Sequence, residues 1–211
     1  MSSDSCSSPP ALAWIRSRVS TSRFEPNVEF SDDRIAELIA YACEAPSAYN
    51  LQNWRFIAVR SPAAKQKLCE LAYGQRQVLD AAVTIIVIGT LNGHEHIRAN
   101  IEPMVGAGLL SEQELQSWVD DTQRDYEADP RKQRDEAIRS ASLAAMTLMA
   151  AAQGLGLDSG PMGGFDAQAV QAEFGLGPAE IPVMLVAIGR AAADNWPRKP
   201  RRPVPDLLSI V

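Results

Sequence analysis

An unbroken run of apolar residues places the strongest constraint on the fold of this chain. Val83 to Ile88 reads VTIIVI, a single threonine among five aliphatic side chains. A strand with one face in water alternates apolar and polar residues, whereas a strand buried on both faces reads as a continuous apolar run. The sequence therefore predicts a central strand that other elements cover on both sides.

The rest of the chain supplies further strands and many helices. Strands are predicted at 54–59 and 183–188, and helices at 10–16, 32–45, 62–72, 75–79, 111–129, 130–153 and 166–174. The stretch 91–110 is rich in Gly, Asn and His and is predicted to be mostly loop, and 155–164 to be a short connection. A long helical stretch before the last strand breaks a regular βαβ alternation, which indicates a mixed α/β or α+β protein.

Composition excludes several classes of function. The 211 residues include 26 acidic and 20 basic side chains, and the net charge of −6 argues against broad binding to nucleic acid or an anionic membrane. No segment approaches the roughly 18 consecutive apolar residues that a membrane helix needs. Residues 1–10 are predicted to be a disordered leader and residues 11–211 a single domain. Three cysteines without CxxC spacing indicate reduced thiols in a cytoplasmic protein.

Common catalytic motifs are absent. Gly154, Gly156 and Gly160 form GxGxxxG after a predicted helix, which does not match the dinucleotide-binding fingerprint. His94 and His96 form an HxH pair without a third ligand nearby, so no metal site is predicted. Because the chain has only these two histidines, a serine or cysteine catalytic triad is not favoured either. What remains is chemistry carried by a cofactor, or no chemistry.

Two basic stretches at opposite ends of the domain could bind an anion. In 18–24 (RVSTSRF), Arg18 and Ser20 combine a guanidinium with a hydroxyl, a pair that suits phosphate. The stretch 198–203 (RKPRRP) is a basic cluster in an acidic protein. The ordinary alternatives are an exposed basic loop and a solvated tail.

Two further stretches could contact a flat heterocyclic ligand. In 45–54 (APSAYNLQNW), Ser, Asn and Gln side chains on a connection can hydrogen-bond ring carbonyls and nitrogens, although a turn would have the same composition. In 160–166 (GPMGGFD), consecutive glycines before a helix let backbone N–H groups approach a ligand. A simple glycine-rich turn with Asp166 as helix N-cap is the alternative.

Together and in this order, these stretches resemble the FMN-binding segments of the nitroreductase family. The resemblance extends from about Arg18 to the C-terminus and is closest to small bacterial NAD(P)H nitroreductases, some linked to quinone detoxification. The phrases that carry it are APSAYNLQNW, AYGQRQV, RDEAIRSASLAAMTLMAAA, GLDSGPMGGFD and IPVMLVAIG. It implies an α+β, three-layer fold with a central, mostly antiparallel sheet flanked by helices. It also implies an intertwined homodimer with flavins at the interface.

The resemblance assigns cofactor roles residue by residue. The residues expected to bind FMN are Arg18, Val19, Ser20, Ser22, Pro46, Ser47, Ala48, Asn50, Gln75, Pro161, Met162, Gly163, Gly164, Lys199 and Arg201. The resemblance places the two basic ends at the phosphate, 46–50 on the partner's flavin, Gln75 near the pyrimidine edge, and Gly163–Gly164 at the reactive edge. Ser22 stands where relatives often have Lys or Arg, and Gly163 where some have an acidic residue.

The implied activity is ping-pong hydride transfer. NADH or NADPH would reduce FMN, and a nitroaromatic, a quinone or a similar small-molecule acceptor would then be reduced through flavin N5, without a catalytic side chain. One alternative is another reaction of the same superfamily, such as reductive dehalogenation or flavin cleavage, with residues 91–129 as a substrate lid. The other is a flavin-binding protein without turnover.

Overall fold

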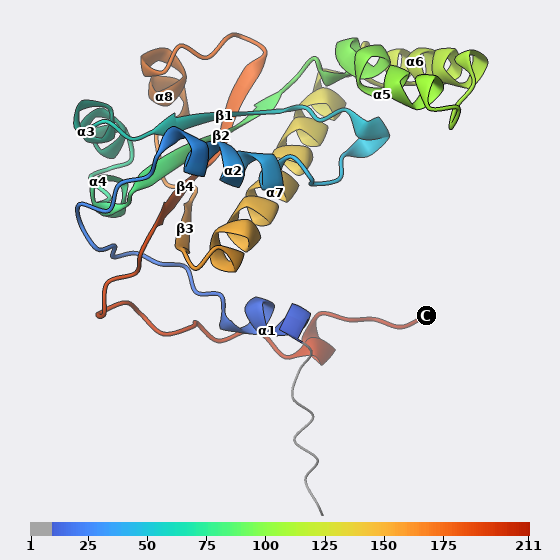
Figure 1. Ribbon diagram of the computed structural model, residues 1–211. Helices are drawn as coiled ribbons and strands as arrows, with labels where there is room; N and C mark the ends of the chain where they lie inside the picture. The colour runs from blue at the N-terminus through green and yellow to red at the C-terminus, as the bar shows by residue number, and fades with distance from the viewer. Residues whose placement is uncertain (1–9) are drawn as a thin grey trace, which may run out of the picture.

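The computed structural model describes residues 10–211 (Figure 1). The predicted leader lies outside the described residues except for Pro10, which begins helix α1 (Pro10–Ser17). No helix among the described residues is long and apolar enough to cross a membrane.

Four strands form one antiparallel sheet. They are β1 (Trp54–Val59), β2 (Val83–Thr90), β3 (Asp158–Met162) and β4 (Glu180–Gly189), in the order β1-β2-β4-β3, and every neighbouring pair is antiparallel. The apolar run forms β2, whose residues are all buried except Thr90 at its end. The prediction of a strand covered on both faces is confirmed.

Helices cover both faces of the sheet and make three layers. One face carries α2 (Asp32–Ala42) and α7 (Pro130–Gly154), and the other carries α3 (Pro62–Leu71), α4 (Gln77–Asp80) and α8 (Ala167–Glu173). Figure 1 shows α3, α4 and α8 grouped away from the long helix α7. Along β2, Ile85 and Val87 join the α2–α7 core, whereas Ile86 and Ile88 join the other. The α+β, three-layer fold is confirmed.

Three helices begin at N-caps that the sequence indicates. The side chains of Ser31, Asp129 and Asp166 accept hydrogen bonds of 3.0–3.2 Å from backbone amides in the first turns of α2, α7 and α8. Such caps satisfy amides that have no partner within the helix. They account for the accuracy of these predicted starts.

The expectation that 91–110 is mostly loop is wrong. After a short 3-10 turn η2 (Gly93–His96), helix α5 (Ile97–Gly106) packs against α6 (Glu112–Tyr126), and we call the pair the α5–α6 hairpin. Ile97 and Ile101 form a buried face of α5 that, with α6, builds a separate small core. Packing thus outweighs Pro103 inside the helix. In Figure 1 the hairpin stands apart from α3 and α8.

The expectation that 155–164 is only a connection is also wrong, because it contains β3. Gly160 and Pro161 are unusual in a strand, but β3 is an edge strand that pairs with β4 alone. An edge strand tolerates proline, since one side of its backbone has no ladder partner. Two further 3-10 turns, η1 (Ala48–Asn50) and η3 (Val204–Asp206), lie outside the layers' main helices.

Candidate functional site

A cavity of about 270 Å³, which we call the basic cavity, is lined by two segments. One is residues 18–24 after α1, which we call the first segment, and the other is the C-terminal tail that follows β4. The residues that line the cavity are Arg18, Val19, Ser20, Ser22, Trp196, Pro197, Arg198, Lys199 and Arg201. The structure thus brings together the two basic ends that the sequence separates by most of its length. The cavity also includes Trp196 and Pro197, which lie outside the stretches that the sequence analysis singled out, and Arg198, which it did not assign to FMN.

No carboxylate among residues 10–211 neutralises the positive charge in this cavity. Among the described residues, none of the four cations Arg18, Arg198, Lys199 and Arg201 forms an ion pair with a carboxylate. Burial, followed by the nearby charges of Arg201 and Arg198, lowers the pKa of Arg18. An anion between these groups would relieve their mutual repulsion, and guanidinium groups suit phosphate oxygens.

Asn195 holds the tail against the first segment. Its Oδ1 accepts hydrogen bonds from the backbone amides of Ser22 and Arg23, at 2.9 and 3.0 Å, and its Nδ2 donates to the carbonyl of Arg23 at 2.7 Å. A β-bridge between Phe24 and Ala191 lies beside this contact. The sequence analysis missed Asn195, and no local pattern marks it because its partners are 172 and 173 positions away.

The first segment also lies directly on β3. The Thr21 amide donates to the Ser159 carbonyl at 3.0 Å. At Gly160 a Cβ would overlap the Thr21 carbonyl oxygen, so only glycine allows this approach. The basic cavity is therefore fixed to the edge strand that runs on to Gly163.

The side chain of Gln75 contacts the backbone of Gly164. The Gln75 Nε2 donates to the Gly164 carbonyl at 2.6 Å, and its Oε1 accepts from Gln77 Nε2 at 3.2 Å. No heavy atom lies within 4 Å of a Cβ built on Gly163, so the backbone there faces open space. The side chain of Met162 is instead buried in the core, which leaves only its backbone for a ligand.

The stretch 46–50 does not join this group within one chain. Its turn η1 leads into β1, which is the opposite edge of the sheet from β3. Trp54 at the start of β1 pairs with Gly89 of β2, which pairs in turn with the first residues of β4. Strand β3 pairs instead with the last residues of β4. Figure 1 shows this light-blue turn on the side of the molecule that carries the α5–α6 hairpin.

Similarity to known proteins decides the family. The sequence profile described as the nitroreductase family matches residues 15–190, which include all four strands and helices α2 to α8 but not the C-terminal tail. The chain belongs to the nitroreductase family.

Individual relatives match 84–95% of this chain. MhqN of Bacillus subtilis, assigned as an NAD(P)H nitroreductase, is 33% identical over 199 residues, 93% of this chain and 97% of that protein. A CLA biosynthesis enone reductase from Lactiplantibacillus plantarum is 31% identical over 181 residues, 84% of this chain and 83% of that protein. A protein of Exiguobacterium sibiricum assigned as a nitroreductase, solved in complex with FMN, is 28% identical. Its TM-score is 0.87, over 95% of this chain and 96% of that chain.

The histidine pair of this nitroreductase lies away from the basic cavity. His94 is buried and stacks on Tyr126, with ring centroids 6.3 Å apart. Burial, followed by the charge of Glu136, raises the pKa of Tyr126 to about 12.

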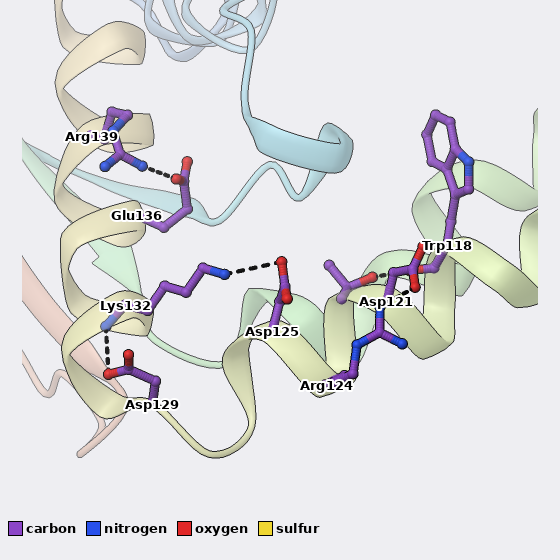
Figure 2. A network of polar contacts seen from close by, with 9 residues as sticks. Trp118, Asp121, Arg124, Asp125, Asp129, Lys132, Glu136 and Arg139 are labelled. Carbon is purple, nitrogen blue, oxygen red and sulfur yellow. Dashed lines mark hydrogen bonds and ion pairs between the residues drawn. The ribbon is translucent and has the colours of Figure 1, made fainter.

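Figure 2 shows Lys132 joining Asp125 on α6 to the start of α7, with 3.0 Å between Lys132 Nζ and the Asp125 carboxylate. Within residues 10–211 no three metal-ligating side chains cluster.

A pair of neighbouring substitutions tests how the tail is held. Asn195→Ala removes the hydrogen bonds to the first segment and should lower the free energy of unfolding by about 1–3 kcal/mol. Asp194→Ala, the matched control, breaks only an exposed ion pair with Arg23 and should cost at most about 1 kcal/mol. Urea unfolding of both nitroreductase variants measures the difference. Equal losses would show that Asn195 does not hold the tail.

Proposed function

We propose that this chain is an FMN-dependent NAD(P)H oxidoreductase that reduces nitroaromatics, quinones or similar acceptors. The observation that carries the proposal is the basic cavity, which is joined through β3 to the open backbone at Gly163. Its four cations have no carboxylate partner in the part of the chain that the structure describes. The relative from Exiguobacterium sibiricum, solved with FMN, supports the choice of ligand.

The residues of the basic cavity fit the phosphate end of FMN. Arg18, Lys199 and Arg201 would neutralise the phosphate charge, and the hydroxyls of Ser20 and Ser22 line the same cavity. Arg198 also lines it. We infer that Arg198 supplies the positive charge that relatives often place at the position of Ser22.

The row of residues that follows fits the ring. Gly163 and Gly164 would present backbone to the reactive edge, next to Pro161 and the backbone of Met162. Gln75 holds the Gly164 carbonyl, so it would fix this backbone while lying near the pyrimidine edge. When bound, FMN supplies hydride transfer between NAD(P)H and the acceptor in alternating half-reactions.

The chain itself would bind and orient rather than transfer protons. Neither the lining of the basic cavity nor the run 160–164 contains a carboxylate or a histidine. Positive charge beside the flavin would favour its reduced, anionic form. We therefore assign no catalytic side chain to this site.

We propose that a second copy of the chain completes the site. Pro46, Ser47, Ala48 and Asn50 precede the far edge strand of the sheet, so in this dimer they would contact the flavin of the other copy. Large apolar side chains that one copy leaves exposed lie on α1, on α7 and in the tail: Leu12, Ile15, Leu143, Met146, Leu207, Leu208 and Ile210. An intertwined homodimer would bury them.

The flavin test uses the purified protein and two matched ligands. FMN should give the protein a flavin absorbance that NADH or NADPH bleaches without oxygen, whereas riboflavin, which lacks the phosphate, should bind far more weakly. Light scattering of the same sample should give a dimer mass. A protein that gains no flavin absorbance from added FMN would contradict the proposal.

Reduction of a carbon–carbon double bond is a second candidate reaction. The similarity to the enone reductase of Lactiplantibacillus plantarum favours it. Adding a nitroaromatic, a quinone or an enone to the reduced protein and following flavin reoxidation under anaerobic conditions separates these acceptors. The acceptor class that reoxidises the flavin fastest identifies the preferred reaction.

A further inference from the structure

The turn that precedes β1 has an unusual backbone. Tyr49, Asn50 and Gln52 have φ values of 50°, 55° and 47°, in the left-handed region that residues other than glycine rarely adopt. Three such residues within four positions are strained, and strain of this kind persists only where the surroundings hold it. We call residues 49–52 the left-handed turn.

The hydrogen bonds that the amides of this turn donate stay within residues 47–52. The amides of Asn50 and Leu51 donate to the carbonyls of Ser47 and Ala48, at 3.2 and 2.9 Å, and the Gln52 amide donates to Ser47 Oγ at 2.9 Å. These bonds close the turn on itself. They do not fix its position relative to the rest of the molecule.

Asn100 on α5 supplies that connection. Its Nδ2 donates to two successive carbonyls of the turn, Asn50 at 3.1 Å and Leu51 at 2.9 Å. The Leu51 side chain is buried in the core of the α5–α6 hairpin, and the Tyr49 ring meets Trp118 of α6 edge to face, with centroids 6.3 Å apart. Three successive residues of the turn therefore contact the hairpin.

We propose that Asn100 is a positioning residue of the flavin site, because it fixes the left-handed turn to α5 and so sets where Ser47 and Asn50 stand. The inference rests on the proposed function, in which these two side chains contact the flavin bound across the dimer. It makes the α5–α6 hairpin part of the support of that site. A shift of the hairpin would then move Asn50 with it.

Two substitutions remove the contact in different ways. Asn100→Leu keeps the size and deletes both donors, whereas Asn100→Asp keeps the shape and turns an acceptor toward the two carbonyls. Gln113→Leu is the matched control, because Gln113 is an exposed amide on the same hairpin. The aspartate variant separates the loss of hydrogen bonds from a change in packing.

The first readout needs no flavin. Hydrogen exchange of the amides of Asn50, Leu51 and Gln52 in the flavin-free protein should become about tenfold faster, or more, in both Asn100 variants. It should stay unchanged in Gln113→Leu. Unchanged exchange in both Asn100 variants would overturn the proposal.

The second readout connects the turn to the cofactor. The dissociation constant of FMN should rise about tenfold in both variants, which corresponds to the loss of roughly one to two hydrogen bonds. The visible circular dichroism of bound FMN should also change, while the far-ultraviolet spectrum does not. Faster exchange with unchanged FMN affinity would show that the turn lies outside the flavin site and would overturn the inference. A wild-type chain that binds no FMN contradicts the proposed function, and the exchange measurement still decides whether Asn100 holds the turn.

Discussion

Gly160→Ala is expected to lower the free energy of unfolding by about 2–3 kcal/mol, because the added methyl group would overlap the Thr21 carbonyl oxygen. That oxygen belongs to the backbone, so the whole segment must move rather than a flexible side chain. For a chain of this size the loss corresponds to a melting temperature lower by about 5–10 °C. Differential scanning calorimetry of the flavin-free protein measures it.

The same substitution should also weaken cofactor binding. Thr21 follows Ser20 and precedes Ser22, which both line the basic cavity, so a displaced Thr21 carries these residues away from Lys199 and Arg201. Gly154→Ala is the matched control: no heavy atom lies within 4 Å of its added Cβ, and the residue ends helix α7. Alanine there should leave the melting temperature unchanged or raise it slightly. Equal melting temperatures for the two variants would refute the close approach at Gly160.

The elements that the sequence predicts well are those whose signals are local. The run in β2 needs cover on both faces wherever it stands, and the N-cap Asp129 followed by Pro130 defines the start of α7 without reference to the fold. These signals depend on neighbours in the chain. They therefore survive in the folded protein.

The two elements that were missed depend on tertiary contacts. In α5, Asn100 and Pro103 obscure the apolar face formed by buried Ile97 and Ile101 and half-buried Met104, and Gly93 lies just before the helix. The spacing of these three apolar residues by four and three would have indicated a helix. In β3, glycine and proline suggest a turn. They are accepted in a strand only because it lies at the edge of the sheet beside Thr21, which the sequence alone does not show.

The site divides in the same way. The sequence singles out Arg18 and Arg201 as residues that suit phosphate, but their meeting in one cavity depends on Asn195, whose contacts span most of the chain. Arg198 was not singled out as a site residue because its charge is indistinguishable, in sequence, from that of the exposed Arg202. Charge composition identified the tail, and only the fold shows which of its cations face the cavity.

Arg18→Ala is expected to raise the dissociation constant of FMN roughly 10- to 150-fold, since a hydrogen bond to a charged group is worth about 1.5–3 kcal/mol. Arg18 is partly buried, and it is crowded by Arg201 and Arg198, which lower its pKa. Its removal should relieve that repulsion in the flavin-free protein. This gain in stability should offset the loss of the packing that the side chain provides. Affinity should therefore fall with little change in the stability of the flavin-free protein.

Arg202→Ala is the matched control for charge. Arg202 belongs to the same tail and donates to the Asp206 carbonyl at 3.2 Å, but it does not line the basic cavity. Its loss lowers the net charge by the same amount, so any effect of overall charge on FMN binding appears in both variants. A fall in affinity specific to Arg18→Ala and Arg201→Ala can then be attributed to the cavity.

Riboflavin decides whether the cavity acts on the phosphate. In the wild-type protein FMN should bind much more tightly than riboflavin, because only FMN carries the phosphate that the cavity would neutralise. Arg18→Ala should weaken the binding of FMN and leave the binding of riboflavin nearly unchanged. The difference between the two affinities should therefore narrow, which lowers the ratio of the FMN affinity to the riboflavin affinity. Combining Arg18→Ala with Arg201→Ala should narrow it further, but by less than the product of the single effects, since both cations would contact one phosphate. A ratio that is the same in wild type and variants would place the phosphate elsewhere.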